Sequence, residues 1–367
     1  MTMKRIVVKI GSSSLTNAKG ELDYTQIDDH VRAIATLKQA GYEVLLVSSG
    51  AVAAGFHKLG YPTRPVTVKG KQAAAAVGQG LLIQLYHERF AAFGITPAQV
   101  LLTRTDFLSK ERYKNAYATF EVLLERGIIP IINENDTVSV EELTFGDNDM
   151  LSALVSGLVH ADQCIILTDI NGLYTANPTK DPTATQIPTL SAITDEMLGY
   201  ADNTGSSVGT GGMSSKLLAA KRALDAGVKV FIGRGNGSHK LLEILDGKGD
   251  GTYIEHDELA FVTNDKQWIT LAETKGHIYV DAGAENALLF NGKSLLPAGI
   301  LRVEGDFKRH DVVEVHGTTG LLGRGEVLYT PDELAQAIGK RTDEIDNYPI
   351  EVIHRNRWVA NEQEEVL

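Results

Sequence analysis

Short runs that are apolar at almost every position, each ending in a turn of small or acidic residues, constrain the fold of this chain most. The clearest runs are residues 5–10, 44–47, 128–132, 164–167 and 228–232. A strand without polar alternation is typically buried on both faces, as in a parallel sheet with helices on each side. Helical patterns lie between these runs, so the sequence predicts an α/β fold with a doubly wound, mainly parallel sheet sandwiched by helices.

The last third of the chain has a different pattern. Its strand-like pieces are short and are separated by Gly, Pro and Asp turns: 278–280, 300–303, 312–315 and 325–328. This spacing predicts a small, mostly β barrel. We therefore expect four parts, namely an α/β domain, a linker, a mostly β domain and an acidic tail, over residues 1–255, 256–274, 275–356 and 357–367.

Charge and hydropathy exclude several classes of protein. The formal net charge is −12, and residues 275–367 carry 10 Lys and Arg against 16 Asp and Glu. Nucleic-acid affinity depends largely on basic contacts to phosphates, so we do not expect a nucleic-acid partner. No apolar run approaches the roughly 18 residues of a transmembrane helix, so we expect no membrane span.

The first residues and the single cysteine suggest a cytoplasmic location. Residues 1–5 lead directly into the first predicted strand, which leaves no room for a signal peptide. Cys164 lies in an apolar run and has no second cysteine with which to form an internal disulfide. We expect it to be a buried thiol in a reducing compartment.

Residues 131–150 concentrate carboxylates between a predicted buried strand and a predicted helix. Glu134, Asp136, Asp147 and Asp149 lie in short turns there. Ligands of open parallel sheets bind where the strands end. Two like charges about 4 Å apart cost roughly 4 kcal/mol at an effective dielectric constant of about 20. We therefore expect cations close to these turns.

Two lysines could supply those cations. Lys9 ends the first predicted strand beside the turn at Gly11, where its side chain either extends out of the sheet edge or meets an anion. Lys216 is the last residue of the glycine-rich sequence GSSVGTGGMSSK and falls in the first turn of a helix that we expect Ser214 or Ser215 to cap. The helix dipole disfavours a cation there, and a bound phosphate would reverse that penalty; a solvated lysine is the alternative.

Two further turns follow predicted strands. Ser49 and Gly50 offer backbone N–H groups to a phosphate or a carboxylate, although many such turns bind nothing. Thr168, Asp169 and the nearby Tyr174 could hold the ribose and base of a nucleotide or form a plain surface loop. Lysines, glycine turns and carboxylates in this combination are typical of phosphoryl transfer, which depends mainly on positioning and cationic stabilisation.

Six motifs, in this order, carry a family resemblance: VVKIGSS, VSSGA, IINEND, GDND, TDINGLYTANP and GTGGMSSK. Together they resemble the glutamate 5-kinases of the amino-acid kinase family, and the C-terminal part resembles a PUA domain. The match spans nearly the whole chain. It implies the amino-acid kinase fold and ATP-dependent phosphorylation of the side-chain carboxylate of L-glutamate to L-glutamyl 5-phosphate, the first step of proline biosynthesis. It also implies Mg2+, feedback inhibition by proline and a homo-oligomer, either a dimer or a tetramer.

The resemblance also assigns roles to residues. Lys9 and Lys216 would contact the transferring phosphoryl group while Asp149 holds their ammonium groups in position. The glutamate site would be formed by Ser49, Gly50, Asp136, Asp147 and Asn148. The nucleotide would contact Lys9, Gly11, Thr168, Asp169, Tyr174, Thr210, Gly211, Gly212, Met213, Ser214, Ser215 and Lys216. No protein ligand of Mg2+ is predicted, because the phosphates of ATP would hold most of the ion.

Two alternatives remain open at the level of the residues alone. One is a kinase for another small acid or amine, such as aspartate, acetylglutamate or carbamate, since spacing and charge do not separate these substrates. The other is an RNA-binding regulatory protein with an inactive kinase scaffold, which the net charge and the intact Lys9, Asp149 and Lys216 oppose.

Proline could compete with glutamate at the acidic loop of residues 137–146.

Overall fold

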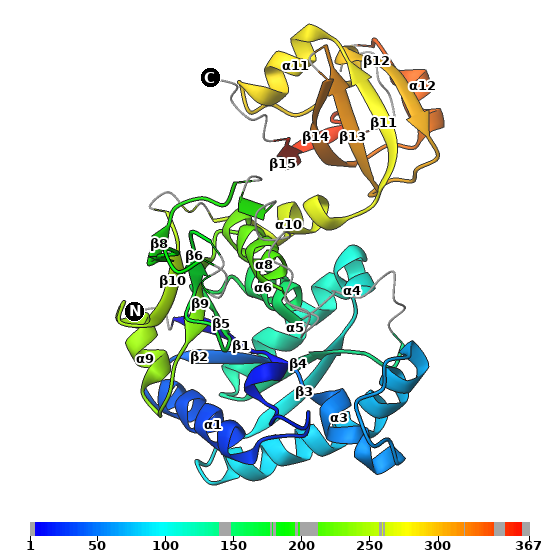
Figure 1. Cartoon of the computed structure of the whole chain (residues 1–367). Helices are drawn as coiled ribbons and strands as arrows, with labels where there is room; N and C mark the ends of the chain where they lie inside the picture. Colours follow the sequence, from blue (N-terminus) through cyan, green and yellow to red (C-terminus); the bar gives the residue numbers. More distant parts are fainter. Residues whose placement is uncertain are drawn as a thin grey trace. The chain divides into compact units, whose positions relative to one another are not determined.

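The computed structural model describes residues 4–138, 148–176, 178, 181–194, 197–198, 212–256, 259, 261–318, 320–340 and 349–361. They belong to two compact units (Figure 1). The first unit comprises Met1–Asp106 and Lys114–Phe261, and the second comprises Phe107–Tyr113 and Val262–Leu367.

An eight-stranded sheet forms the centre of the first unit, in the order β3-β4-β2-β1-β5-β9-β10-β8. All neighbouring strands run parallel except β9 and β10, which are antiparallel. The strands are β1 (Arg5–Ile10), β2 (Glu43–Ser48), β3 (Pro97–Leu102), β4 (Ile129–Glu134), β5 (Gln163–Leu167), β8 (Thr189–Leu190), β9 (Lys229–Arg234) and β10 (Asp250–Ile254). A separate small ribbon pairs β6 (Leu173–Tyr174) with β7 (Gln186–Ile187). The predicted doubly wound, mainly parallel sheet is confirmed.

Helices cover both faces of this sheet (Figure 1). One face shares a core with α1 (Tyr24–Gln39), α3 (Val68–Ala91) and α9 (Lys240–Leu245). The other face packs against α6 (Asn148–Leu158) and α8 (Met213–Asp225). The remaining helical segments up to residue 125 are η1 (Ser12–Ser14), α2 (Ala51–Gly55), η2 (His57–Leu59), α4 (Arg104–Leu108) and α5 (Lys110–Glu125).

The alternation of side chains along β1 decides which residues face which helices. Ile6, Val8 and Ile10 belong to the core on the α1 and α3 side. Because successive side chains of a strand point to opposite faces, Lys9 faces the other side. On that side, Cys164 of β5 is fully buried and its thiol donates to the hydroxyl of Ser152 on α6, at 3.7 Å. Lys9 therefore points toward α6, and the expectation of a buried Cys164 is confirmed.

The second unit contains a five-stranded sheet in the order β12-β11-β13-β14-β15. Its strands are β11 (Thr274–Val280), β12 (Ile300–Gly305), β13 (Val312–Gly317), β14 (Gly320–Val327) and β15 (Ile353–Ala360), accompanied by α10 (Asn264–Leu271), α11 (Ala282–Leu289), η4 (Pro297–Gly299) and α12 (Pro331–Ala337). Only the neighbours β11 and β13 are parallel among these five strands. Buried apolar residues such as Phe307, Tyr329 and Trp358 form a core within this unit.

The ranges that the sequence predicted as a linker and as an acidic tail both contain regular structure. The range 256–274, expected to be a linker, includes α10, and the indole of Trp268 on this helix donates to the carbonyl of Leu108 at 3.0 Å. The range 357–367, expected to be a tail, begins inside β15, and residues 362–367 lie outside the described part of the chain. Among the helices that the structure describes, none combines the length and the apolar character needed to cross a membrane.

Candidate active site

The carboxyl ends of the central strands lie level with one another. Ile10 at the end of β1 pairs with Ser48 of β2 on one side and with Leu167 of β5 on the other. Val47 of β2 pairs with Ile132 of β4, one residue before β2 reaches this level. The turns that follow these strands therefore meet at one edge of the sheet, which is where open parallel sheets bind ligands.

Three charged side chains from three different elements meet at this edge. Lys9 of β1 forms an ion pair with Oδ1 of Asp149, which lies in the first turn of α6. Lys216, in the first turn of α8, places its Nζ 3.0 Å from Oδ2 of the same carboxylate. The exposed fractions of Lys9, Asp149 and Lys216 are 4%, 0% and 6%. The structure therefore brings together the three residues that the sequence suggested as catalytic.

Opposite charges meet in this cluster. Burial by itself raises the pKa of Asp149, but the ammonium groups of Lys9 and Lys216 outweigh burial and hold that pKa below its ordinary value. The carboxylate of Asp149 is thus held ionised between two ammonium groups in a place with little water. The two ammonium groups can attract an anion that reaches them, with little screening by water.

Among the described residues of the cluster, the only carboxylate has both oxygens directed at lysines and not at a site for Mg2+. Each carboxylate oxygen of Asp149 faces a lysine ammonium group. Mg2+ prefers octahedral oxygen ligands and, at nucleotide sites, is commonly shared between one or two carboxylates, phosphates and water. The ammonium donors of this cluster fit an anion.

Asn148 connects the start of α6 to the turn that follows β2. Its Nδ2 donates to the carbonyl of Ser48 at 2.7 Å, and the same atom lies 3.0 Å from Oγ of Ser49 and 2.8 Å from Oδ1 of Asn133. Asn133, 2% exposed, donates in turn to Gln79 of α3 at 2.9 Å. The position of the Ser49 turn is thus fixed by hydrogen bonds to two helices. Asn133 was not predicted as a site residue; a polar side chain at the end of an apolar strand is the signal that could have found it.

The turn continues through Gly50 into α2. Gly50 has φ 103°, a left-handed conformation that side chains other than glycine adopt at a cost. The hydroxyl of Ser48 shares a hydrogen bond of 2.9 Å with the hydroxyl of the buried Tyr86 on α3. These contacts hold the Ser49–Gly50 turn beside the first turn of α6.

Asp136 follows β4 at the same edge of the sheet. Burial and, to a smaller extent, the charge of Glu134 raise the pKa of Asp136 to about 6, against the opposing effect of Arg64. This carboxyl group therefore loses its proton close to neutral pH. A cation beside it would favour the ionised form.

Comparisons with known proteins identify the family. The model of the amino acid kinase family matches residues 4–234, and the model of the PUA domain matches residues 276–349. Glutamate 5-kinase 1 of Bacillus subtilis strain 168 is 62% identical over 361 residues, which cover 98% of this chain and 99% of that protein. Glutamate 5-kinase of Geobacillus kaustophilus strain HTA426 is 58% identical over 372 residues, which cover 100% of both proteins. The chain belongs to the glutamate 5-kinase family. The resemblance seen in the sequence motifs is confirmed.

In this chain, the predicted nucleotide residues Thr168 and Asp169 lie beside the cluster. The Oδ1 atom of Asp169 accepts hydrogen bonds from the hydroxyl of Thr168 at 3.1 Å and from the hydroxyl of Ser13 at 3.3 Å. Ser13 belongs to the turn that starts at Gly11, where a Cβ added to the glycine would lie 3.4 Å from the Nζ atom of Lys9. Gly11, Lys9 and the Thr168 turn are thus adjacent. Tyr174 lies on β6 and donates to Asn171 at 2.8 Å.

The helix α8 begins earlier than the sequence predicted. Gly212 is the N-cap residue and Met213 the first helical residue, so Ser214 and Ser215 lie inside the helix. The hydroxyl of Ser215 donates to the carbonyl of Gly212 at 3.0 Å. The expected capping by Ser214 or Ser215 is therefore wrong, because the helix begins before them.

Asp147, Thr210 and Gly211, together with most of the acidic loop 137–146, lie outside the described residues.

Proposed function

We propose that this chain transfers the terminal phosphoryl group of ATP to the side-chain carboxylate of L-glutamate, giving L-glutamyl 5-phosphate and ADP in the first step of proline biosynthesis. The buried cluster of Lys9, Asp149 and Lys216 at the sheet edge is the observation that supports this reaction most strongly. The identity of 62% to Bacillus subtilis glutamate 5-kinase 1 supports the choice of glutamate among small acids.

The charge of the cluster suits this chemistry. Both reactants are anions, so their approach is opposed by repulsion that the ammonium groups of Lys9 and Lys216 would offset. As a carboxylate oxygen of glutamate forms its bond to the γ-phosphorus, the bond from that phosphorus to the bridging oxygen breaks and ADP takes the electron pair. Lys9 and Lys216 would stabilise the charge on the transferring group, and Asp149 would keep both ammonium groups in place.

The glutamate site would lie between Asp136 and the turn held by Asn148. The α-ammonium group of the substrate would pair with Asp136, whose pKa is raised mainly by burial and then by the charge of Glu134, against the opposing effect of Arg64. Ser49 and Gly50 would provide hydrogen bonds to a carboxylate, and Asn148 would hold their turn in place. Asp147 is proposed to lie close to the same substrate.

The nucleotide would approach the cluster from the side of Thr168 and the start of α8. Gly11, Thr168 and Asp169 are adjacent to Lys9 through the Ser13 hydrogen bond, and Gly212 to Lys216 begin α8. Tyr174, Thr210 and Gly211 complete the proposed set. Mg2+ would be held mainly by the phosphates of ATP, and its chemistry there is charge neutralisation.

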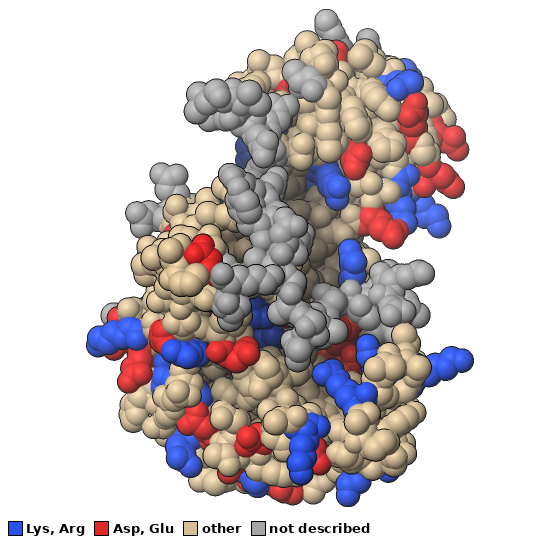
Figure 2. All heavy atoms as spheres, in the orientation of Figure 1, with Lys and Arg blue, Asp and Glu red and all other residues tan. Residues whose placement is uncertain are grey.

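Regulation and assembly are proposed on the resemblance alone. Proline would inhibit by competing with glutamate near residues 137–146, so added glutamate should relieve the inhibition. A homo-oligomer is expected. The RNA-binding alternative gains no support from the surface that Figure 2 shows, where Lys and Arg side chains are interspersed with Asp and Glu side chains.

Trapping of the product with hydroxylamine tests the proposed reaction. An acyl phosphate reacts with hydroxylamine to give a hydroxamate, so glutamate with ATP and Mg2+ should give γ-glutamyl hydroxamate and one equivalent of ADP. Aspartate, acetylglutamate and carbamate, offered at the same concentration, serve as matched controls. A higher rate of ADP release with any of these three would identify a different substrate, and ADP release without hydroxamate would contradict carboxyl phosphorylation.

A further inference from the structure

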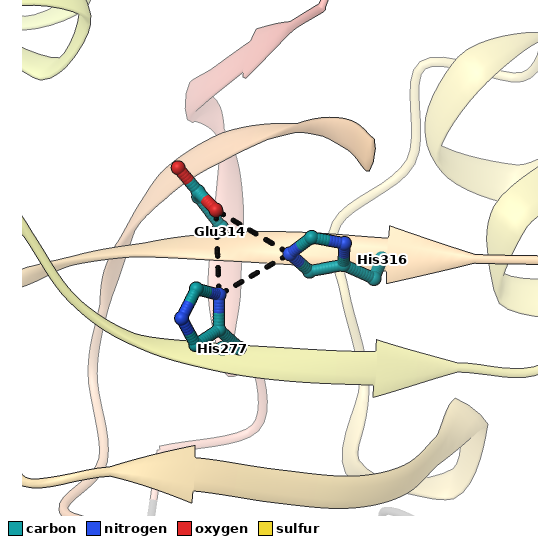
Figure 3. Close-up of side chains that lie close together, drawn as sticks. All are labelled: His277, Glu314 and His316. Atoms are coloured by element: carbon teal, nitrogen blue, oxygen red, sulfur yellow. Dashed lines mark hydrogen bonds and ion pairs between the residues drawn. The ribbon is translucent and has the colours of Figure 1, made fainter. Parts of the chain in front are cut away.

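Two neighbouring strands of the second unit present three metal-ligating side chains on one face of the sheet. β11 and β13 run parallel, with His277 opposite Glu314 and Tyr279 opposite His316. The residues between them, Ile278 and Val315, are fully buried in the core of the unit. Because side chains alternate along a strand, His277, Glu314 and His316 share the opposite, outer face. Figure 3 shows the three side chains directed toward one another.

The distances between their ligand atoms match the edges of a tetrahedron around a metal ion. Nδ1 of His277 lies 3.2 Å from Nε2 of His316, and Oε2 of Glu314 lies 3.3 Å and 3.4 Å from these two nitrogens. Zinc bonds of about 2.0–2.1 Å in tetrahedral geometry separate the ligand atoms by about 3.3–3.4 Å. A typical N–H···O hydrogen bond is shorter, about 2.9–3.0 Å.

We propose that His277, Glu314 and His316 bind a divalent first-row transition-metal ion, with Zn2+ as the best match. Two imidazole nitrogens and one carboxylate oxygen suit Zn2+, Co2+ or Ni2+, whereas Mg2+ prefers oxygen ligands alone. Three protein ligands leave the fourth position of the tetrahedron to water or to an external group. The side chains of His277, His316 and Glu314 are 43%, 24% and 17% exposed, so an ion can enter from solvent.

Neighbouring groups orient the three ligands. Oε1 of Glu314 faces Nη2 of Arg324 at 3.6 Å and accepts from the hydroxyl of Thr274 at 3.5 Å, which leaves Oε2 directed at the histidines. The ring of Tyr279 stacks on the ring of His316, with centroids 5.3 Å apart and planes inclined by 26°. Such outer contacts fix the orientation of ligands around bound metals.

A network of hydrogen bonds without a metal is the competing explanation. The two facing imidazole nitrogens lie 3.2 Å apart, so at least one of them must be unprotonated. Glu314 can then accept a hydrogen bond from the other ring. This network would hold the same side chains together but would give no affinity for Zn2+ above that of isolated surface histidines.

The test uses the full chain, treated with a chelator and free of nucleotide. Titration with Zn2+ against a competing chromophoric chelator should show one tight equivalent in the unaltered protein. His277→Ala, His316→Ala and Glu314→Gln should each weaken that equivalent by at least about tenfold, the minimum effect of altering even an outer contact of a metal site. His354→Ala is the matched control, because His354 lies on β15 of the same unit and pairs with the carboxylate of Glu351, outside the proposed site.

A second readout does not depend on the folding of variants. Co2+ added to the unaltered protein should give the intense visible absorption of a tetrahedral site, and one equivalent of Zn2+ should abolish it. Equal Zn2+ affinity in the unaltered protein and the His277→Ala or His316→Ala variant would overturn the proposal. Absence of any Co2+ spectrum would do the same. ADP release from ATP and glutamate, measured alongside, reports separately on the proposed kinase activity.

Discussion

At the scale of single residues, Lys216 gives the most direct test of the charge cluster. Its ammonium group lies against Asp149 and would act mainly on the charge that develops during phosphoryl transfer. We expect Lys216→Ala to lower kcat by about 100- to 1000-fold, a loss typical of removing one preorganised charge-stabilising group. The KM for glutamate should change far less. Steady-state kinetics checks this, with Lys229→Ala, an exposed lysine of β9, as the control. Near-normal turnover would remove Lys216 from its proposed role.

The raised pKa of Asp136 leads us to expect that the KM for glutamate depends on pH. Burial raises its pKa to about 6, so the group is ionised above that pH and neutral below it. If the carboxylate pairs with the ammonium group of glutamate, the KM for glutamate should rise as pH falls from 7 to 5, by up to about tenfold per unit below the pKa. Asp136→Asn should have a high KM that no longer changes over this range. Asp246→Asn, at an exposed carboxylate, should behave as the unaltered enzyme. A flat KM between pH 5 and pH 7 would contradict the assignment.

We expect replacement of Glu326 to lower the stability of the second unit. Its side chain is 2% exposed and accepts from Lys110 at 2.5 Å and from His310 at 2.8 Å. Burial by itself raises the pKa of Glu326, but the hydrogen bonds from Lys110 and His310 outweigh burial and lower it. A lowered folded pKa means that the stabilisation is present above the unfolded pKa and is lost as pH falls through the folded value. Glu326→Gln should therefore lower the free energy of unfolding by about 2 kcal/mol at neutral pH.

Chemical unfolding at two pH values checks this expectation. The difference between Glu326→Gln and the unaltered protein should shrink as the medium is acidified below about pH 4.5, because Glu326 then becomes protonated first in the unfolded state and finally in both states. Glu304→Gln, at an exposed glutamate of the same unit, is the control. A difference that is the same at both pH values would mean that packing, and not charge, accounts for the effect.

At the scale of elements, two glycines allow α2 and α3 to cross closely enough to fix the Ser49 turn. A Cβ at Gly78 would lie 1.8 Å from the carbonyl oxygen of Ala51, and one at Gly55 would lie 2.0 Å from the carbonyl oxygen of Ala74. Neither carbonyl can move without shifting its helix. We expect Gly78→Ala to lower the free energy of unfolding by about 1–3 kcal/mol, the range for overpacked interiors. It should also raise the KM for glutamate, because α2 starts directly after Gly50.

Gly80 provides the matched control on the same helix. It is exposed, and no described atom lies within 4 Å of a Cβ built there. Gly80→Ala should therefore stabilise the protein by about 0.5–1 kcal/mol through the higher helix propensity of alanine. Thermal unfolding of both variants distinguishes a clash from a general effect of glycine replacement. Equal shifts in the two variants would show that the helices are not in close contact.

Comparing the observed elements with those expected from the sequence shows which features could be predicted. β1 was predicted with its observed bounds, and Lys9, Asp149 and Lys216 were expected together because each lies at the end or the start of an element with a clear local pattern. α10 was missed because Trp268, its buried anchor, pairs with Leu108, a residue 160 positions away. The triad in the second unit was missed for a related reason, since His277 and Glu314 meet only through the parallel pairing of β11 and β13.

At the scale of the whole molecule, the two units have separate apolar cores. The core around β1, α1 and α3 draws its buried residues from the first unit, and the core around Phe307 and Tyr329 draws its residues from the second. The proposed kinase site belongs to the first unit and the proposed metal site to the second. A ligand that binds only the folded state of one unit should therefore stabilise that unit selectively.

Differential scanning calorimetry of the full chain should show two unfolding transitions that respond to different ligands. A non-hydrolysable ATP analogue with Mg2+, at about 100 times its Kd, should stabilise one unit by about 2.7 kcal/mol, which shifts its transition by roughly 5–10 °C for a unit of this size. Zn2+ should shift only the other transition, by a larger interval because that unit is smaller. His316→Ala should abolish the Zn2+ shift and leave the nucleotide shift intact. A single transition that moves with either ligand would show instead that the two cores unfold as one cooperative system.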